Sequence, residues 1–197
     1  MTKKGAQTQE RLLTTTLDLI ERQGFHNTGL QQILRESGAP KGSLYFHFPG
    51  GKDQLVAVAL AQGAGSIRSL LEQAFAQAPS LSEALRLVVQ GLEARLRESD
   101  FQKGCPVATV ALEAGDDHPD VQQACREAYG AWLDTIASAL TRGGWPESKA
   151  REDAAVTLSA IEGALILARV TRSVQPLQQV SRTLIMQLQQ GPVEAGV

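Results

Sequence analysis

The sequence has few of the residues that stabilise small secreted proteins, and no segment that would anchor it in a membrane. Its two cysteines, Cys105 and Cys125, are too few for a disulfide framework, which excludes the disulfide-rich secreted class and favours a reducing compartment. The N-terminus is polar and charged and lacks an apolar signal-peptide segment. Uninterrupted apolar runs such as Gly163–Ala168 are too short to span a bilayer. We therefore expect a cytoplasmic protein with no membrane partner.

Signatures of catalysis and cofactor binding are also missing. The sequence contains no H-E-x-x-H zinc motif, no P-loop, no G-x-S-x-G elbow and no dinucleotide fingerprint. Its three histidines and two cysteines do not have zinc-ligand spacing. A cysteine-dependent enzyme would have to use Cys105 with His118 and Asp117, and nothing in the sequence brings a base to that thiol. We predict no enzymatic activity, no cofactor and no metal site.

The sequence does contain a succession of amphipathic helices, and no segment with strand periodicity. With 197 residues, of which 43% are hydrophobic, the chain can bury a substantial core. We expect an all-α fold of about nine helices, preceded by a mobile basic arm at Lys3-Lys4-Gly5. The predicted helices cover approximately residues 8–23, 28–37, 40–46, 52–78, 80–97, 106–114, 119–142, 147–174 and 176–190.

The stretch Thr28–Lys52 predicts two short helices joined by a tight glycine turn. Thr28 followed by Gln31 has capping-box spacing, which favours a helix start at this point. Gly38 supplies the left-handed backbone that ends the first helix. Pro40 then begins the second helix, in whose first turn the missing N–H costs nothing.

The second of these helices is short and has an unusual composition. We expect Leu44 and Phe48 to anchor it inward, which leaves four polar residues facing outward: Lys41, Ser43, Tyr45 and His47. Gly42 weakens the helix, so we expect a reason for a glycine at this position. Glycine allows the helix backbone to approach another surface closely, and the second helix of a helix-turn-helix approaches the DNA major groove in this way.

This segment resembles the DNA-binding domain of the tetracycline-repressor (TetR) family of transcriptional regulators. The matching residues are Gly24-Phe25, Thr28, Ile33, Ser37-Gly38, Lys41-Gly42-Ser43-Leu44-Tyr45, His47-Phe48 and Lys52-Asp53-Gln54-Leu55. Ala39-Pro40 departs from the pattern, since the family more often has a branched apolar residue followed by serine or threonine. The resemblance implies a three-helix helix-turn-helix head over residues 1–51 and a helical ligand-binding and dimerisation body over residues 52–197.

The expected partner is double-stranded operator DNA. Residues 1–53 hold seven Lys/Arg and five Asp/Glu, whereas the rest of the chain holds twelve and sixteen, so the head is the basic end. We expect Lys41, Lys52 and His47 to contact phosphates, Thr28 and Tyr45 to add hydroxyl contacts, and Ser43 to lie closest to base edges beside Gly42.

The last two predicted helices favour a homodimer. The helix over residues 147–174 is apolar nearly all round in its second half, so it has to be buried on several sides. With residues 176–190 it can form a four-helix bundle between two subunits, in a seam that we expect to include Leu165 and Leu184. Two heads related by a two-fold axis would bind a palindromic operator.

The segment GCPVATVALE resembles the LmrA- and YxaF-like subgroup of the family, which implies a repressor whose body binds a small molecule. We expect a small apolar effector between walls formed by Tyr129, Trp132 and Ile136, with Glu162 as a polar anchor and Cys105 nearby. The alternative is that these are ordinary core or surface residues. Cys105, near the start of a short helix, leaves open a thiol-based sensor of oxidants or electrophiles, or a buried inert thiol.

Overall fold

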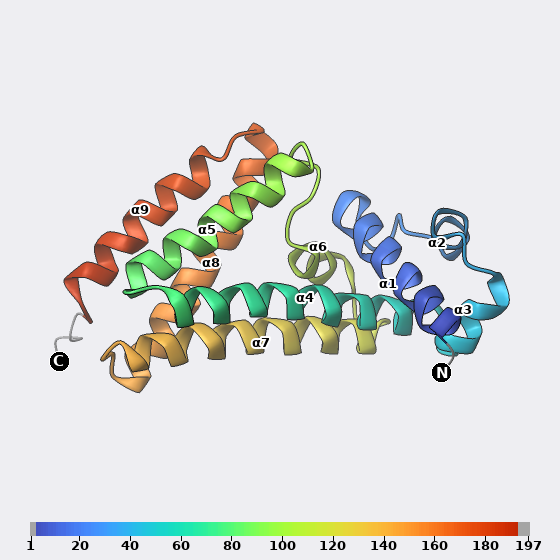
Figure 1. The fold of residues 1–197 in the computed structure, drawn as a ribbon, viewed down its shortest axis with the longest axis horizontal. Coiled ribbons are helices and arrows are strands. Elements are labelled where there is room, and N and C mark those ends of the chain that lie inside the picture. Colours follow the sequence, from blue (N-terminus) through green and yellow to red (C-terminus); the bar gives the residue numbers. More distant parts are fainter. Residues whose placement is uncertain (1–2, 193–197) are drawn as a thin grey trace. The chain divides into compact units, whose positions relative to one another are not determined.

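The computed structural model of the chain describes residues 3–192 and contains nine α-helices and no strand within that range (Figure 1). The helices are α1 (Lys3–Gln23), α2 (Leu30–Ser37), α3 (Lys41–His47), α4 (Gly51–Gln77), α5 (Leu81–Glu98), α6 (Pro106–Glu113), α7 (Pro119–Arg142), α8 (Glu147–Thr171) and α9 (Gln175–Gln190). The predicted all-α fold is confirmed, and most boundaries fall within a few residues of those expected.

The start of α1 differs from the prediction. The helix begins at Lys3 and includes Gly5, so the expected mobile arm over Lys3-Lys4-Gly5 is wrong. A glycine inside a helix costs only about 1 kcal/mol relative to alanine, which packing further along the helix can offset. Thr8 is buried and its hydroxyl donates to the carbonyl of Lys4 at 3.0 Å, which fixes the first turns.

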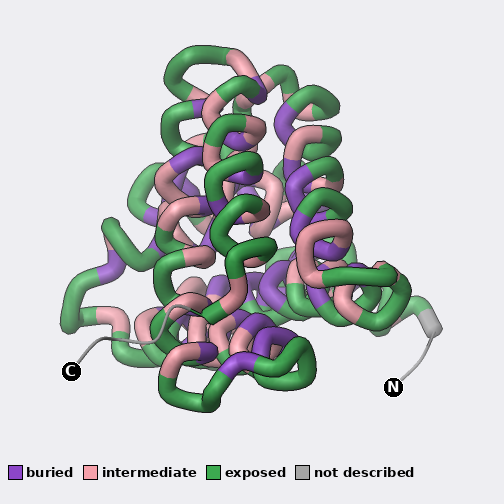
Figure 2. Tube along the Cα trace, turned by 90° about the vertical axis from the view of Figure 1, so that its left-hand side faces the viewer, coloured by how far each residue is buried: buried purple, intermediate pink, exposed green. Residues whose placement is uncertain are grey.

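Buried and exposed positions alternate with helical periodicity along the chain (Figure 2). Helix α1 packs against α2, α3 and α6. The core of the head comes from α1, α2, α3 and the start of α4, and its buried members are Leu12, Leu13, Leu19, Ile33, Ala39, Leu44, Phe48, Leu55 and Ala59. Because Leu55 and Ala59 belong to this cluster, the first turns of α4 are part of the head.

One predicted helix end is confirmed and one is wrong. Gly38 ends α2 with φ +63°, in the left-handed region, and the Ser80 side chain caps α5 by accepting a hydrogen bond from the Glu83 amide at 3.2 Å. The capping box predicted at Thr28 does not form. The N-cap of α2 is Gly29, which has no side chain to make the bond.

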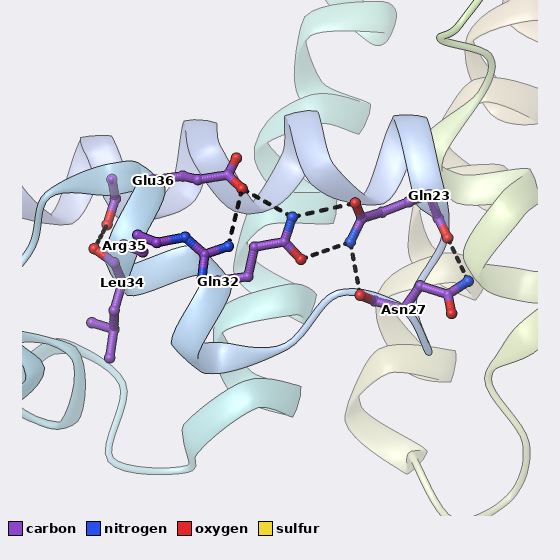
Figure 3. A network of polar contacts seen from close by, with 7 residues as sticks. Gln23, Asn27, Gln32, Leu34, Arg35 and Glu36 are labelled. Carbon is purple, nitrogen blue, oxygen red and sulfur yellow. Dashed lines mark hydrogen bonds and ion pairs between the residues drawn. The ribbon is translucent and has the colours of Figure 1, made fainter.

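A polar network joins the end of α1 to α2 (Figure 3). The Gln23 amide donates to the Gln32 side-chain oxygen at 2.9 Å and to the Asn27 carbonyl at 2.7 Å. The Gln32 amide donates in turn to Glu36 at 2.9 Å. These bonds, together with the apolar core, fix the angle between α1 and α2, and therefore the position from which α3 departs.

The chain divides into two compact units. One comprises residues up to Gly65 together with Cys105–Tyr129, and the other comprises Ser66–Gly104 with the chain from Gly130 onward. The predicted boundary between residues 51 and 52 falls inside the first unit, because the start of α4, all of α6 and the start of α7 pack with the head. In the second unit, α9 packs against both α5 and α8.

Candidate functional site

Helix α3 is held in the head by two residues and presents its other side to solvent. Leu44 and Phe48 are 0% and 1% exposed and anchor the helix in the core, as predicted. On the opposite side Lys41 and Gly42 are exposed and Tyr45 is 49% exposed, while Ser43 and His47 are half-buried. The structure therefore brings five of the seven predicted DNA-contacting residues together on one short helix.

Thr28 does not belong to this surface. Its side chain is 0% exposed, and its hydroxyl donates to the carbonyl of Gly24 at 2.6 Å. The loop between α1 and α2 folds back on itself at this point, so the hydroxyl closes a turn inside the head. A group with no exposed surface cannot contact a phosphate, and the predicted role of Thr28 is therefore corrected to a structural one.

Lys52 is also engaged inside the protein. Its ammonium donates to the carbonyl of Phe25 at 2.7 Å and lies 4.2 Å from the centre of the Phe25 ring. Burial lowers the pKa of Lys52, and the carboxylates of Asp53 and Glu113 partly oppose that shift. The side chain thus ties the start of α4 to the loop after α1, and its expected phosphate contact stays a prediction.

Phe46 is the functional candidate that the sequence analysis missed. It lies on α3 between the two anchors, and its side chain is 75% exposed. Helical spacing could have identified it. The position two residues after Leu44 and two before Phe48 lies on the side of the helix opposite the core. The ring of Phe46 meets the ring of His47 edge-on, with centroids 5.0 Å apart.

Contacts within the first unit join the head to α6 and to the start of α7. The His26 amide donates to the Glu113 carboxylate at 2.9 Å, and the His26 ring lies 2.9 Å from the Glu113 carbonyl oxygen. The His118 ring nitrogen Nδ1 lies 2.8 Å from the Asp53 carboxylate. His118 also packs edge-on against Phe25, with ring centroids 4.7 Å apart. The carboxylate partner of His118 is therefore Asp53. The hypothesis of a cysteine-dependent enzyme required Asp117 as that partner.

The two cysteines have different surroundings. Cys105 is half-buried and forms the N-cap of α6, where its sulfur accepts a hydrogen bond from the Ala108 amide at 3.4 Å. Cys125 is buried within α7, and this burial raises the pKa of its thiol. Of the two, only Cys105 has the surroundings expected for a responsive thiol.

The predicted effector residues are distributed over both units. Trp132 and Ile136 are 2% and 5% exposed and belong with the half-buried Glu162 to the second unit, whereas Cys105 and the half-buried Tyr129 belong to the first. Among the described residues of the second unit, a groove of about 690 Å³ lies between α5 and α9, and another of about 250 Å³ lies between α8 and α9. None of the five predicted residues lines either groove.

Helix α8 carries apolar residues that the chain itself does not cover. Ile166, Leu167 and Val170 are 51%, 55% and 76% exposed, and Met186 on α9 is 54% exposed. By length and composition alone α8 could cross a membrane, and only 28% of its most apolar window is buried within the chain. An exposed apolar face of this kind marks a surface that another apolar surface covers. Leu165 and Leu184, which we expected in the seam, are instead buried inside the chain.

Comparison with known proteins agrees with this arrangement. A family model described as "Bacterial regulatory proteins, tetR family" matches residues 12–59, and one described as "Transcriptional regulator LmrA/YxaF-like, C-terminal domain" matches residues 82–183. The chain is 34% identical to the HTH-type transcriptional regulator LmrA of Bacillus subtilis over 88% of this chain and 92% of that one. It is 30% identical to the HTH-type transcriptional regulator YxaF of the same organism, over 93% of this chain and 96% of that one. The structure also resembles that of a TetR-family regulator from Agrobacterium tumefaciens, with a TM-score of 0.82, 19% identity, and coverage of 93% of this chain and 98% of that one.

Proposed function

The chain belongs to the TetR family of bacterial transcriptional regulators, with an LmrA/YxaF-like C-terminal domain, and from this premise we propose that it is a ligand-released repressor. In this proposal a cytoplasmic homodimer binds a palindromic operator through two copies of α3. A small apolar molecule bound in the body, within residues 52–197, lowers the affinity of the head for DNA. The observation that carries the proposal is the solvent-facing side of α3, held rigidly by Leu44 and Phe48.

The side chains on α3 suit the two kinds of contact that a DNA-binding helix makes. Lys41 is exposed at the first turn and is our candidate phosphate contact. Tyr45 and His47 are further candidates, which would donate hydrogen bonds to phosphate oxygens. Ser43 and Gly42 lie where a base edge would approach. A cation at Lys41 would add affinity for any sequence, while the residues beside it would select among sequences.

We propose that the exposed apolar residues of α8 and α9 form the dimer interface. One α3 helix of seven residues can contact few bases, so a single head would bind weakly. Two heads on a two-fold axis double the contacts and match the symmetry of a palindrome. Ile166, Leu167 and Val170 would be buried in the process, which removes the apolar surface that a lone chain leaves in water.

We base effector release on the family to which the chain belongs. We propose Tyr129, Trp132, Ile136 and Glu162 as residues of the effector site. A second candidate signal is oxidation or alkylation of Cys105. This candidate is favoured by the position of the half-buried sulfur at the N-terminus of α6, the helix whose other end, at Glu113, contacts the head.

The first test is duplex binding by the parent protein and by Lys41→Ala across a salt series. If Lys41 contacts one phosphate in each head, the variant should lose affinity for operator and unrelated DNA alike. The slope of log affinity against log salt should fall by about two for the dimer. Arg142→Ala, which removes one exposed cation from the end of α7, is the matched control and should bind like the parent. An unchanged slope for Lys41→Ala would remove this residue from the interface, and the absence of any salt-sensitive, sequence-selective binding would refute the repressor proposal.

A further inference from the structure

Phe46 is the most exposed aromatic side chain in the described part of the chain, at 75%. Leu44 and Phe48, on either side of it, are in the core, and His47 stacks edge-on against the Phe46 ring, while Tyr45 is also exposed. Apart from this contact, the folded monomer leaves most of this large apolar ring in water. Its position on the proposed recognition helix calls for a partner outside the protein.

The surroundings of Phe46 leave room for such a partner. Gly42 precedes Phe46 by four residues and therefore lies one turn before it on the same face. A Cβ atom at Gly42 would meet no atom of another part of the chain within 4 Å, so the protein leaves space beside this position. Lys41 and Tyr45, which are also exposed and four residues apart, run beside this pair. The face therefore consists of an open glycine and an apolar ring, flanked by polar groups.

The chemistry of the ring limits what it can recognise in a major groove. Phenylalanine has no hydrogen-bond donor or acceptor. Guanine, adenine and cytosine present polar donors and acceptors at the groove edge, and burying them against a benzene ring would leave those groups unsatisfied. Thymine also presents an acceptor, O4, but it alone has an apolar group at that edge, its C5-methyl. The match between Phe46 and the groove is therefore specific to one base.

We propose that Phe46 selects thymine in each half of the operator, through contact between its ring and the thymine C5-methyl group. This inference rests on the proposed function, because it requires α3 to enter the major groove. It adds the identity of a base and the residue that recognises it. The open position at Gly42 admits the methyl group beside the ring, and the same contact recurs in both half-sites of a symmetric dimer.

The experiment removes the methyl group without changing any hydrogen bond. An operator is first obtained by selection from a random duplex pool, and each thymine pair related by the two-fold axis is then replaced by deoxyuridine. Affinity for each duplex is measured for the parent, Phe46→Ala and Phe46→Leu. Tyr45→Phe is the control, because it removes a hydroxyl from the neighbouring residue and leaves the Phe46 ring in place. Because Phe46 is exposed, the variants should fold, and their thermal unfolding is recorded alongside.

We expect one symmetric thymine pair at which deoxyuridine weakens parent binding by about fourfold per half-site, the value for one methyl-sized apolar group. Phe46→Ala should bind the thymine and deoxyuridine operators equally at that pair. Phe46→Leu should keep part of the difference, and Tyr45→Phe should keep all of it. 5-Methylcytosine should be accepted there better than cytosine, since it restores the methyl group.

Three results would overturn the inference while leaving DNA binding intact. They are a parent protein indifferent to deoxyuridine at every position, a Phe46→Ala variant as sensitive to the methyl group as the parent, and a loss of binding in Phe46→Ala that is equal for all sequences. The last would place the ring against the sugar–phosphate backbone or between base pairs. Failure to select any duplex is a different outcome, because it would refute the proposed function itself.

Discussion

Gly24 shows how one residue can serve two purposes in the head. It ends α1 with φ +86°, and its amide donates to the Ile20 carbonyl at 3.0 Å. A Cβ atom at this position would lie 2.1 Å from the Glu113 carboxylate. That carboxylate accepts the hydrogen bond from the His26 amide, so it is not free to move away without loss. Only glycine satisfies both the backbone conformation and the approach of α6.

Gly24→Ala should therefore destabilise the protein by about 2–3 kcal/mol. The left-handed conformation costs an L-residue about 1–2 kcal/mol, and displacing Glu113 loses a hydrogen bond worth about 1 kcal/mol. Gly51→Ala is the matched control, because Gly51 has φ +70° and nothing within 4 Å of its Cβ position. Thermal unfolding of the two variants separates the two contributions. Equal losses in both would show that the contact with Glu113 adds nothing.

At the residue scale, periodicity predicted the anchors but not the hydrogen-bond partners. Leu44 and Phe48 follow from helical spacing alone, and both are in the core. Thr28 and Lys52 were assigned to DNA because they are polar and lie near the recognition helix. Their actual partners, the carbonyls of Gly24 and Phe25, are set by how the loop after α1 folds, and side-chain pattern carries no information about that.

At the scale of elements, α8 has two apolar faces with different roles. Ile161, Ala164, Leu165 and Ala168 are buried within the chain, whereas Ile166, Leu167 and Val170 are exposed. The sequence indicated burial on several sides, because the second half of this helix has almost no polar face. It could not assign a residue to the subunit's own core or to a partner, since both environments select the same side chains.

Charge placed on the exposed face of α8 should separate the subunits without unfolding them. Val170→Glu puts a carboxylate at a position that is 76% exposed in the single chain, so the monomer tolerates it. In the proposed interface each of the two buried charges would reduce the free energy of dimerisation by about 3 kcal/mol or more. Each would therefore raise the dimer dissociation constant more than a hundredfold. Sedimentation velocity should show monomers at micromolar concentration, and operator affinity should fall with dimerisation.

Two further substitutions test the specificity of that result. Leu112 on α6 is 83% exposed, so Leu112→Glu adds the same charge to an exposed apolar position outside the proposed interface, and it should remain dimeric. Leu165 is 7% exposed, and Leu165→Glu should lower the unfolding temperature instead of producing a folded monomer. A parent protein that is itself monomeric, or a dimeric Val170→Glu, would exclude α8 as the interface.

At the scale of the whole molecule, the division between head and body is less simple than the sequence indicated. The start of α4, α6 and the start of α7 form one compact unit with the three N-terminal helices. The contacts that join them are between residues far apart in the chain: His26 with Glu113, and Asp53 with His118. Asp53 and Glu113 lie in segments that resemble the family, but nothing in the sequence pairs them with these histidines, so only a structure could show the contacts. The family resemblance predicted the roles of the two ends but not these contacts.

The contacts between Glu113 and His26 are our candidates for coupling an effector to DNA binding. An effector acts by binding the conformation with low DNA affinity more tightly, and a shift from 1:99 to 99:1 needs a preference of about 5.5 kcal/mol. Linkage then requires operator DNA to weaken effector binding by the same factor as the effector weakens DNA binding. If a residue transmits the change, its substitution should reduce this common factor more than it changes the affinity for DNA or the affinity for the effector.

We therefore expect Glu113→Ala to reduce the effector's influence on operator binding several-fold while retaining most of the DNA affinity of the protein. Native mass spectrometry of the purified dimer, followed by a panel of apolar and electrophilic compounds in operator-release assays, identifies the effector. Cys105→Ser separates the two kinds of signal, because it should abolish release by electrophiles and leave release by a reversibly bound apolar ligand unchanged. Asp117→Ala, which changes a carboxylate near His118 that has no role in the pairing with Asp53, is the control for Glu113→Ala. If no compound in the panel binds or alters operator affinity, the protein binds DNA constitutively, and the contacts of Glu113 serve only to hold the first unit together.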